Sequence, residues 1–382
     1  MSRQPTRRCE DQSRVNFERQ ELVFMVEPGD RQRAVTVADV ARRAGVSKAT
    51  AARALGDYGA VSDSVRERVQ AAAEDLDYRP NELARSMNTG KSKTIGVIVG
   101  DIENGYFGLA MRGISDTAKA AGYDVILINT SENVQTEIDA VRVLLDKRVD
   151  GLIVAPASSF HIEHLRRVDD SGRPLVLLDR RVPGLEAVSV EVDIAPSASD
   201  ATAALLDAGH TRIAFVSALQ TEGEGYSDRL ELRVSSVTDR LAGIVRALRS
   251  RGIEPSADLI RFGALGPQRT RAIVEELLDL EDPPTAILAS DSLIALDVLR
   301  TLKDRGLRVP DDLSFVMFDD FDWAALTDPP LTVVAQPIYD VGVAAATILL
   351  RRLAGLPHHD VQARLPATLV LRDSVGPVPV RA

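Results

Sequence analysis

Residues 36–90 read TVADVARRAGVSKATAARALGDYGAVSDSVRERVQAAAEDLDYRPNELARSMNTG, and the rest of the chain is organised around them. The opening threonine, Thr36, is followed three residues later by Asp39, which is the spacing of a capping box at the start of a helix. Gly45 then supplies the residue type that most easily adopts the left-handed conformation at a helix end. These signals predict a first short helix between Thr36 and Gly45.

A second short helix is predicted directly after the first. Ser47 is a suitable N-cap, and the helix is expected to run from Lys48 to about Leu55. A third helix is expected to begin near Ser62, because its apolar residues recur at helical spacing. Two short helices joined by a tight, glycine-containing turn predict a helix-turn-helix, with the third helix covering the other two.

The second helix is the candidate DNA-reading element. Its outward-facing residues are expected to be Lys48, Ala49, Thr50 and Arg53. A cationic side chain can meet a phosphate or a guanine edge, and a small side chain can contact a thymine methyl group. The alternative is a small structural helical bundle with a solvated, charged face.

The segment that follows carries a family resemblance. The motifs AGVSxxT, VSxxxRxRV and YxPNxxAR, within residues 44–85, resemble the LacI/GalR family of bacterial repressors. The resemblance implies that residues after Pro80 form a hinge helix, and that two hinge helices of a dimer enter the minor groove. Ala51-Ala52 and Met87 stand where the family usually has Val-Ser and Leu. The predicted DNA contacts are Thr36, Ser47, Lys48, Ala49, Thr50, Arg53, Tyr78, Asn81, Ala84, Arg85 and Met87.

Size and composition restrict the class of protein. The 382 residues are 45% hydrophobic and 27% charged, as in an ordinary globular protein with a proper core. A single cysteine, Cys9, allows no internal disulfide and fits a reducing cytoplasm. No apolar stretch is long enough for a membrane span, and the arginine-rich start does not resemble a secretory signal. We therefore expect a cytoplasmic, nucleoid-associated bacterial protein with no membrane partner.

The charge is unevenly distributed along the chain. The whole protein has a formal net charge of −10, whereas residues 36–93 contain ten basic and eight acidic residues, a net charge of +2. This modest positive charge predicts weak DNA binding by one isolated head. Dimerisation and the hinge are expected to add affinity.

Residues 1–35 precede the head as an extension. They contain a small basic cluster of Arg3, Arg7 and Arg8, and they lack helical or strand periodicity. We expect this extension to be mostly disordered. A role as an auxiliary phosphate-binding arm is the alternative.

From Thr94 onward, short apolar runs alternate with amphipathic helical stretches. The runs are TIGVIV (94–99), DVILIN (124–129), DGLIVA (150–155), PLVLLD (174–179), RIAFVS (212–217), TAILAS (285–290) and LSFVMF (313–318). Strands that are apolar throughout and alternate with helices indicate parallel strands covered on both faces. The region is too large for one sheet of typical size, so we predict two doubly wound lobes. The family resemblance implies the same architecture, similar to periplasmic sugar-binding proteins.

Polar and aromatic residues follow several of these strands. They are Asp101, Asn104, Tyr106 and Phe107 after the first strand, Asp179 and Arg180 after the fourth, and Asp291, Asp319 and Asp320 farther on. Ligands of such sheets bind beyond the carboxyl ends of the strands. Carboxylates accept hydrogen bonds from hydroxyl groups, and an aromatic face packs on a CH surface. A hydroxylated small molecule is therefore expected there, although Ser290 and Ser292 are more typical of helix caps.

The resemblance selects among these residues. Arg240-Leu241-Ala242-Gly243 is similar to the family's RLxG segment, whose arginine commonly holds the effector, and Ser290-Asp291 is similar to its N/S-D motif. Val192-Asp193-Ile194 departs from the usual V-D-N. The resemblance implies a sugar or related metabolite as effector. The predicted effector contacts are Asp101, Tyr106, Phe107, Asp179, Arg180, Arg240 and Asp291.

The C-terminal part also resembles the family and completes the predicted domain organisation. Gln336-Pro337 marks an expected crossing between lobes, and the apolar face of the helix at 338–353 is expected to pack in the core. The resemblance implies that this region and the helix at 107–121 also contribute to the dimer face. The predicted divisions are the extension 1–35, the helix-turn-helix domain 36–80, the hinge helix and linker 81–93, and the core 94–376. One lobe is predicted to combine about 94–191 with 321–353, and the other about 194–318 with 356–376.

Signs of other chemistry are weak. Gly90-Lys91-Ser92 mimics the end of a phosphate-binding loop, but Arg85 occupies the position of its first glycine. The histidine pairs at 161/164 and 358/359 have no cysteine partners and no HExxH frame. We therefore expect no enzyme, no cofactor and no metal site.

Two hypotheses of different class remain. The first is an effector-controlled repressor that binds a palindromic double-stranded DNA operator as a homodimer or a tetramer. The second is a cytoplasmic solute-binding or carbohydrate-metabolising α/β protein without operator-specific DNA binding. The hinge-like motif favours the first hypothesis.

Overall fold

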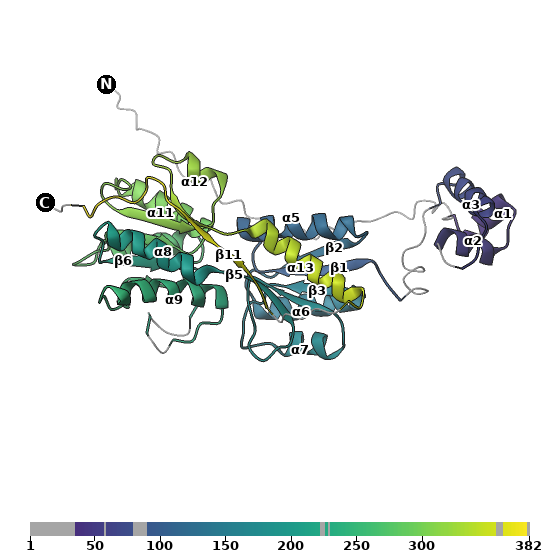
Figure 1. Ribbon diagram of the computed structural model, residues 1–382, viewed down its shortest axis with the longest axis horizontal. Helices are drawn as coiled ribbons and strands as arrows, with labels where there is room; N and C mark the ends of the chain where they lie inside the picture. Colours follow the sequence, from purple (N-terminus) through teal and green to yellow (C-terminus); the bar gives the residue numbers. More distant parts are fainter. Residues whose placement is uncertain are drawn as a thin grey trace, which may run out of the picture. The chain divides into compact units, whose positions relative to one another are not determined.

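The chain divides into a helical head within residues 1–85 and an α/β core within residues 86–382 (Figure 1). The structure is a computed structural model, and it describes residues 35–56, 59–78, 90–221, 226–227, 230–356 and 362–379. Within these ranges, no helix is both long enough and apolar enough to cross a bilayer.

The head contains three short helices. They are α1 (Val37–Ala44), α2 (Lys48–Gly56) and α3 (Asp63–Asp75). Val40 on α1, Ala51 on α2 and Val69 on α3 are each completely buried in one shared cluster. Small side chains at these positions let the helices approach closely, and the predicted helix-turn-helix with a covering third helix is confirmed.

The first lobe of the core is built on a parallel six-stranded sheet with the order β11-β5-β4-β3-β1-β2. Its strands are β1 (Thr94–Val99), β2 (Asp124–Asn129), β3 (Gly151–Val154), β4 (Leu175–Leu178), β5 (Val188–Asp193) and β11 (Gln362–Pro366). Its helices are α5 (Gly105–Ala120), α6 (Val134–Asp146), α7 (Glu163–Asp170) and α13 (Ile338–Leu353).

The second lobe has the strand order β12-β10-β9-β8-β6-β7, with β12 antiparallel to β10 and the other pairs parallel. Its strands are β6 (Ile213–Val216), β7 (Ile260–Arg261), β8 (Ala286–Ala289), β9 (Ser314–Phe318), β10 (Thr332–Ala335) and β12 (Thr368–Val370). Its helices are α8 (Ile194–Asp207), α9 (Ser235–Ser250), α10 (Pro267–Leu278), α11 (Ser292–Asp304) and α12 (Asp322–Leu326).

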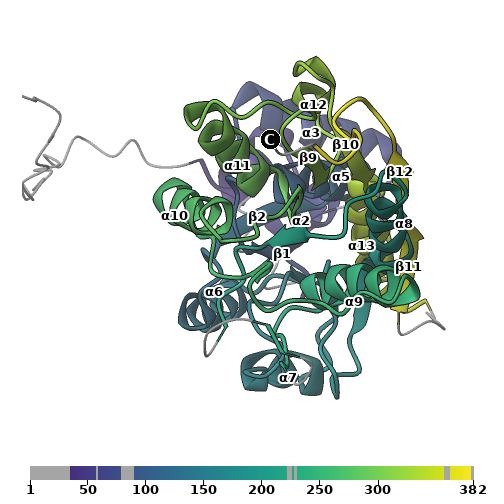
Figure 2. The same ribbon diagram turned by 90° about the vertical axis from the view of Figure 1, so that its left-hand side faces the viewer.

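Both faces of each sheet are covered by helices, which explains the uninterrupted apolar runs. In β1, Val97 belongs to the cluster that includes α5 and α13, whereas Ile98 belongs to the cluster that includes α6 and α7. In the second lobe, α10 and α11 lie on one side of the sheet and α8 and α9 on the other (Figure 2). The predicted architecture of two doubly wound lobes is confirmed.

Glycines bring one helix pair together in each lobe. A Cβ atom added at Gly113 on α5 would lie 2.2 Å from the carbonyl oxygen of Tyr339, and one at Gly342 on α13 would lie 2.0 Å from that of Ala110. In the second lobe, a Cβ at Gly243 on α9 would lie 2.3 Å from a backbone oxygen of α8. This last contact gives a packing reason for the glycine that ends the RLxG-like segment.

The chain crosses between the lobes at three places. The crossings lie between β5 and α8, between β10 and α13, and between β11 and β12.

The strand pairing corrects the predicted lobe boundaries. Within 321–353, residues 332–335 form β10, which pairs with β9 of the second sheet rather than joining the first lobe. Within 356–376, residues 362–366 form β11, which pairs with β5 of the first sheet. β11 reads QARLP, which contains no apolar run that would signal a strand, and its residues are alternately exposed and half-buried. The crossing at Gln336-Pro337 is confirmed.

Candidate functional site

The first helix of the head begins as its sequence predicts. The carboxylate of Asp39 accepts hydrogen bonds from the backbone nitrogen of Thr36 at 3.0 Å and from its hydroxyl at 2.7 Å. The hydroxyl bond is the main reason why the pKa of Asp39 is below its ordinary value. At the other end, Gly45 adopts a left-handed φ of 66°. These local contacts therefore fix where α1 begins and where it ends.

The face of α2 carries the predicted reading residues. The hydroxyl of Ser47 accepts a hydrogen bond from the backbone nitrogen of Thr50 at 3.1 Å, so it caps the helix as predicted. Lys48 and Ala49 are exposed, whereas Thr50 and Arg53 are half-buried. The Arg53 Nε donates to the carbonyl oxygen of Ala49 at 3.2 Å. Small and cationic groups thus lie together on one accessible surface.

The other predicted DNA contacts lie at the end of the head. Tyr78 is half-buried and packs against the hydrophobic cluster of the head. Asn81, Ala84, Arg85 and Met87 lie outside the described residues. Their roles therefore stay predictions.

Two aromatic residues begin α5 in the first lobe. The side chain of Asn104 caps this helix by accepting from the backbone nitrogen of Tyr106 at 3.0 Å. Tyr106 and Phe107 are each 4% exposed, and their rings meet edge to face with centroids 5.5 Å apart. Among the described residues, the buried Tyr106 hydroxyl has no hydrogen-bond partner. Asp101, in the preceding turn, accepts from the backbone nitrogen of Glu103 at 3.0 Å.

The loop after β4 sends consecutive side chains in different directions. Asp179 has a positive φ of 65° and is buried, and its carboxylate accepts from the hydroxyl of Ser236 on α9 at 3.0 Å. Arg180 instead turns back into the first lobe. Its guanidinium donates to both carboxylate oxygens of Glu132 at 2.7 Å and to the carbonyl oxygen of Pro156 at 2.8 Å. Its Nε lies 3.4 Å from the carboxylate of Asp179.

Two predicted effector residues come from the second lobe. Arg240 on α9 is buried, and its Nε has no hydrogen-bond partner among the described residues. Asp291 is the N-cap of α11, because one of its carboxylate oxygens accepts from the backbone nitrogens of Leu293 at 3.0 Å and Ile294 at 3.1 Å. The expectation that the neighbouring serines supply this cap is therefore wrong. The other carboxylate oxygen of Asp291 accepts only from the hydroxyl of Ser290 among the described residues, at 3.2 Å.

Asp319 is a further member of this site that the predicted contact set left out. It follows β9, has a positive φ of 77°, is 1% exposed and accepts a hydrogen bond from the side chain of Gln336. Its place at the end of a strand is visible in the sequence. The sequence did not show that Asp319 lies near Arg240, because the two residues are far apart along the chain.

The charges of these residues act on one another. The pKa of Asp319 is raised to about 7, mainly by burial, with smaller contributions from nearby Asp291 and Asp179, whereas Arg240 and the hydrogen bond from Gln336 oppose the rise. Burial likewise raises the pKa of Asp291, and Arg240 again opposes it. The pKa of Tyr106 lies well above its ordinary value through burial, with added effects of Asp179 and Asp319.

These five residues, Tyr106, Asp179, Arg240, Asp291 and Asp319, form what we call the interlobe cluster. They bring acceptors, a cation and a phenol together from both lobes. A surface pocket of the second lobe contains none of them; it is lined by Leu278, Pro283, Pro284, Arg305, Leu307, Asp312, Leu313 and Pro379.

Two family models match the chain. The model described as bacterial regulatory proteins, lacI family, matches residues 36–81, and the model described as periplasmic binding protein-like domain matches residues 202–375. The first match covers the head, and the second covers most of the second lobe and two of the three crossings between lobes.

Similar proteins extend over nearly the whole chain. Catabolite control protein A of Priestia megaterium is 34% identical over 89% of this chain and 99% of its own length. The HTH-type transcriptional repressor CytR of Escherichia coli strain K12 is 33% identical over 91% of this chain and 98% of its own. Among solved structures, the lac repressor dimer bound to operator and the anti-inducer ONPF is 27% identical, with a TM-score of 0.76. That comparison covers 90% of this chain and 100% of the other.

The fold and the site define an effector-controlled DNA-binding regulator: a helix-turn-helix head joined to a periplasmic-binding-protein-like core. The chain belongs to the lacI family of bacterial regulatory proteins. The predicted family, fold class and general function are thereby confirmed, and the relatives compared are transcriptional regulators.

Proposed function

We propose that this regulator is a repressor that binds a near-palindromic double-stranded DNA operator as a homodimer, with a tetramer of two dimers as the larger alternative. A two-fold dimer presents two identical heads, so its binding site should repeat with inverted symmetry. The accessible surface of α2, with Lys48 and Ala49 exposed, supports placing this helix in the major groove. Ser47, Thr50 and Arg53 border that surface, and Thr36 begins the helix packed behind it.

The hinge is proposed to complete the DNA contact. Arg85 is suited to a phosphate contact, and Met87 is suited to insertion between base steps of the minor groove. Asn81 and Ala84 share that segment. Tyr78, which packs on the head cluster, is proposed to support the head where it meets the backbone of the DNA.

The effector is proposed to be a hydroxylated small molecule, such as a sugar, held between the core lobes. The observation that carries this proposal is the interlobe cluster, in which the Tyr106 hydroxyl and the Arg240 Nε are buried donors without hydrogen-bond partners among the described residues. Buried polar groups are costly unless paired, so a ligand that supplies acceptors here gains affinity. The carboxylates of Asp179, Asp291 and Asp319 would accept from ligand hydroxyl groups.

For the other three predicted effector contacts, Phe107, Arg180 and Asp101, we propose supporting roles rather than direct contact with the effector. Phe107 meets the Tyr106 ring edge to face and would fix its orientation. Arg180 is engaged by Glu132 and Pro156, so we propose that it orients Asp179 rather than reaching the effector with its terminal nitrogens. Asp101 would shape the turn that leads into α5.

Effector binding is proposed to lower operator affinity. An effector shifts the DNA-binding equilibrium only as far as its affinities for the two states differ. We propose that the protein acts by binding alone, without catalysis or cofactor, in the cytoplasm at the nucleoid. One solved relative is described as the CelR–cellobiose complex, at 27% identity and a TM-score of 0.64, which supports trying sugars first.

The test is a mobility-shift titration of the full-length protein on the intergenic DNA next to its own gene. It is repeated with a panel of neutral sugars, sugar phosphates and nucleosides. We expect a sequence-specific shift with an inverted-repeat footprint, weakened at least about tenfold by one class of sugar, as coupling of typical size predicts. A footprint over one unrepeated half-site would contradict the dimer on a palindrome. A specific shift that no sugar alters would contradict the proposed effector class.

A further inference from the structure

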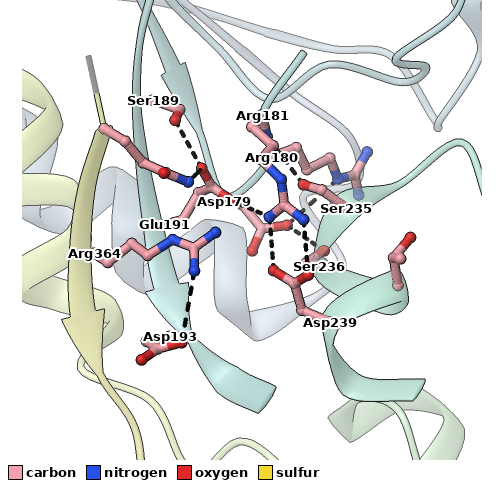
Figure 3. A network of polar contacts seen from close by, with 12 residues as sticks. Asp179, Arg180, Arg181, Ser189, Glu191, Asp193, Ser235, Ser236, Asp239 and Arg364 are labelled. Carbon is pink, nitrogen blue, oxygen red and sulfur yellow. Dashed lines mark hydrogen bonds and ion pairs between the residues drawn. The ribbon is translucent and has the colours of Figure 1, made fainter. Parts of the chain in front are cut away.

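Arg181 is a side chain of the first lobe that reaches into the second (Figure 3). It lies in the loop after β4, and its two terminal nitrogens donate to both carboxylate oxygens of Asp239 on α9, at 2.7 and 2.8 Å. Its backbone nitrogen donates to the hydroxyl of Ser235 at 3.0 Å, again on α9. A bidentate arginine–carboxylate pair fixes both distance and orientation, so this contact depends on the separation of the lobes.

The Arg181 side chain is also bound within the first lobe. Arg181 also donates to Glu191 on β5 at 2.8 Å, and Glu191 is only 2% exposed. The other Glu191 oxygen accepts from the Ser189 hydroxyl at 2.7 Å and from the Gln362 side chain on β11 at 2.6 Å. Glu191 thus anchors the guanidinium, whereas Asp239 is the partner on the second lobe.

The Arg181–Asp239 pair lies next to the interlobe cluster but is not part of it. Arg181 is two residues after Asp179, and Asp239 directly precedes Arg240. The loop that holds Asp179 and the helix that holds Arg240 are therefore also joined beside the cluster. The Arg181 and Asp239 side chains are 33% and 19% exposed, so solvent and salt reach this pair.

We propose that the Arg181–Asp239 pair is a latch that holds the two lobes together in the unliganded core. The latch sets the ratio of closed to open core before any effector binds, and so it tunes effector affinity through the population of the closed state. This inference goes beyond the proposed function, because it concerns the free protein and requires neither the effector nor the operator to be known.

The test measures the distance between the lobes in the full-length protein. Spin labels are attached at Asp170→Cys on α7 and Ser250→Cys on α9, in a Cys9→Ser background, because Cys9 is the only natural cysteine. Labelled protein is diluted into unlabelled protein so that only distances within one chain are read. Distance distributions are recorded for the wild type, for Asp239→Asn and for a matched control.

Asp239→Asn is the informative variant because Arg181 keeps Glu191 as its counter-ion, so no buried charge is left unpaired. The matched control is Asp304→Asn, which removes one of the two carboxylate partners of Arg271, at 2.7 Å and within the second lobe only, and leaves Glu275 as the other. We expect Asp239→Asn to raise the ratio of long to short distances roughly two- to fivefold, as the removal of a partly exposed ion pair implies. Asp304→Asn should leave the distribution unchanged.

Salt supplies a second measurement that needs no change at the latch. Raising NaCl to about 1 M shortens the Debye length to about 3 Å, so the wild-type distribution should move toward that of Asp239→Asn. The salt response should be smaller in Asp239→Asn. A folded Asp239→Asn protein with the wild-type distribution would overturn the proposal. If that variant does not fold, a wild-type distribution that is insensitive to salt would do the same.

Discussion

Arg240 lies over Phe318, with its guanidinium carbon 5.0 Å from the centroid of the ring. The arginine comes from α9, whereas the phenylalanine ends β9 and directly precedes Asp319. This cation–π contact holds the guanidinium at the carboxyl edge of the second sheet without using its hydrogen-bond donors. The Nε donor of Arg240 has no hydrogen-bond partner among the described residues, and we propose that the effector uses it.

The first prediction concerns effector response. Arg240→Ala should lower effector affinity by at least about tenfold, because a buried charged hydrogen bond is worth roughly 1.5–3 kcal/mol. Operator affinity without effector should stay within about twofold of the wild type, because the head is unchanged. Calorimetry with the sugar identified in the mobility-shift panel measures the first effect, and the mobility shift itself measures the second.

Asp291 offers a sharper variant of the same test. Asp291→Ala would also remove the cap of α11, at a cost of roughly 0.5–2 kcal/mol of stability. Asp291→Asn keeps an oxygen that can accept from Leu293 and Ile294. We expect Asp291→Asn to fold normally and yet to weaken the effector response. Unchanged calorimetric affinity in both Arg240→Ala and Asp291→Asn would place the effector elsewhere.

The second prediction concerns base reading by α2. Lys48→Ala should relax sequence preference and weaken operator binding by roughly 1–3 kcal/mol for each base that the lysine reads. Lys303→Ala, which removes an exposed lysine at the end of α11 in the core, is the matched control and should leave binding unchanged. Competition binding against single-base operator variants measures the preference. If Lys48→Ala discriminates among those variants as the wild type does, Lys48 is not a reading residue.

The third prediction uses the pKa of Asp319. Its folded-state pKa of about 7 is raised from an ordinary value of 3.8, mainly by burial, so the folded protein holds this proton over a pH window in which the unfolded chain does not. The stabilisation from the protonated group is fully present below about pH 4, is lost as pH rises to about 7, and is constant above that.

Asp319→Asn should remove this dependence. The difference in unfolding free energy between wild type and variant should therefore change by up to about 1.4 kcal/mol per pH unit within the window, with the wild type losing stability relative to the variant as pH rises. Urea unfolding at several pH values measures the difference. A difference that is constant from about pH 4 to 7 would contradict a raised pKa.

The fourth prediction concerns the packing of α5 against α13. Gly113→Ala should destabilise the core by roughly 1–3 kcal/mol, because the new Cβ would collide with the Tyr339 backbone and the helices must separate. Gly108→Ala lies on the same helix with no atom within 4 Å of the new Cβ. It should be neutral or stabilising by up to about 1 kcal/mol, since alanine favours helix over glycine. Thermal unfolding of the two variants is the comparison, and equal effects would refute the close approach of the helices.

The sequence by itself determined the helices of the head and most strands of the core. Capping pairs such as Thr36 with Asp39, and the left-handed residue Gly45, act over three or four positions, so they can be read along the chain. The long apolar runs likewise indicated strands buried on both faces. The positions of Tyr106, Asp179 and Asp291 after strands or at helix starts also followed from the order of elements.

Only the tertiary structure decided which strands share a sheet and which side chains meet. β10 and β11 each joined the lobe opposite to the predicted one, because hydrogen bonding between strands leaves no mark in either strand's own sequence. The tertiary structure also decided that Asp319 belongs to the interlobe cluster and that the guanidinium of Arg180 pairs with Glu132. Burial and pairing depend on partners brought together by three crossings of the chain, and local sequence carries no record of such distant neighbours.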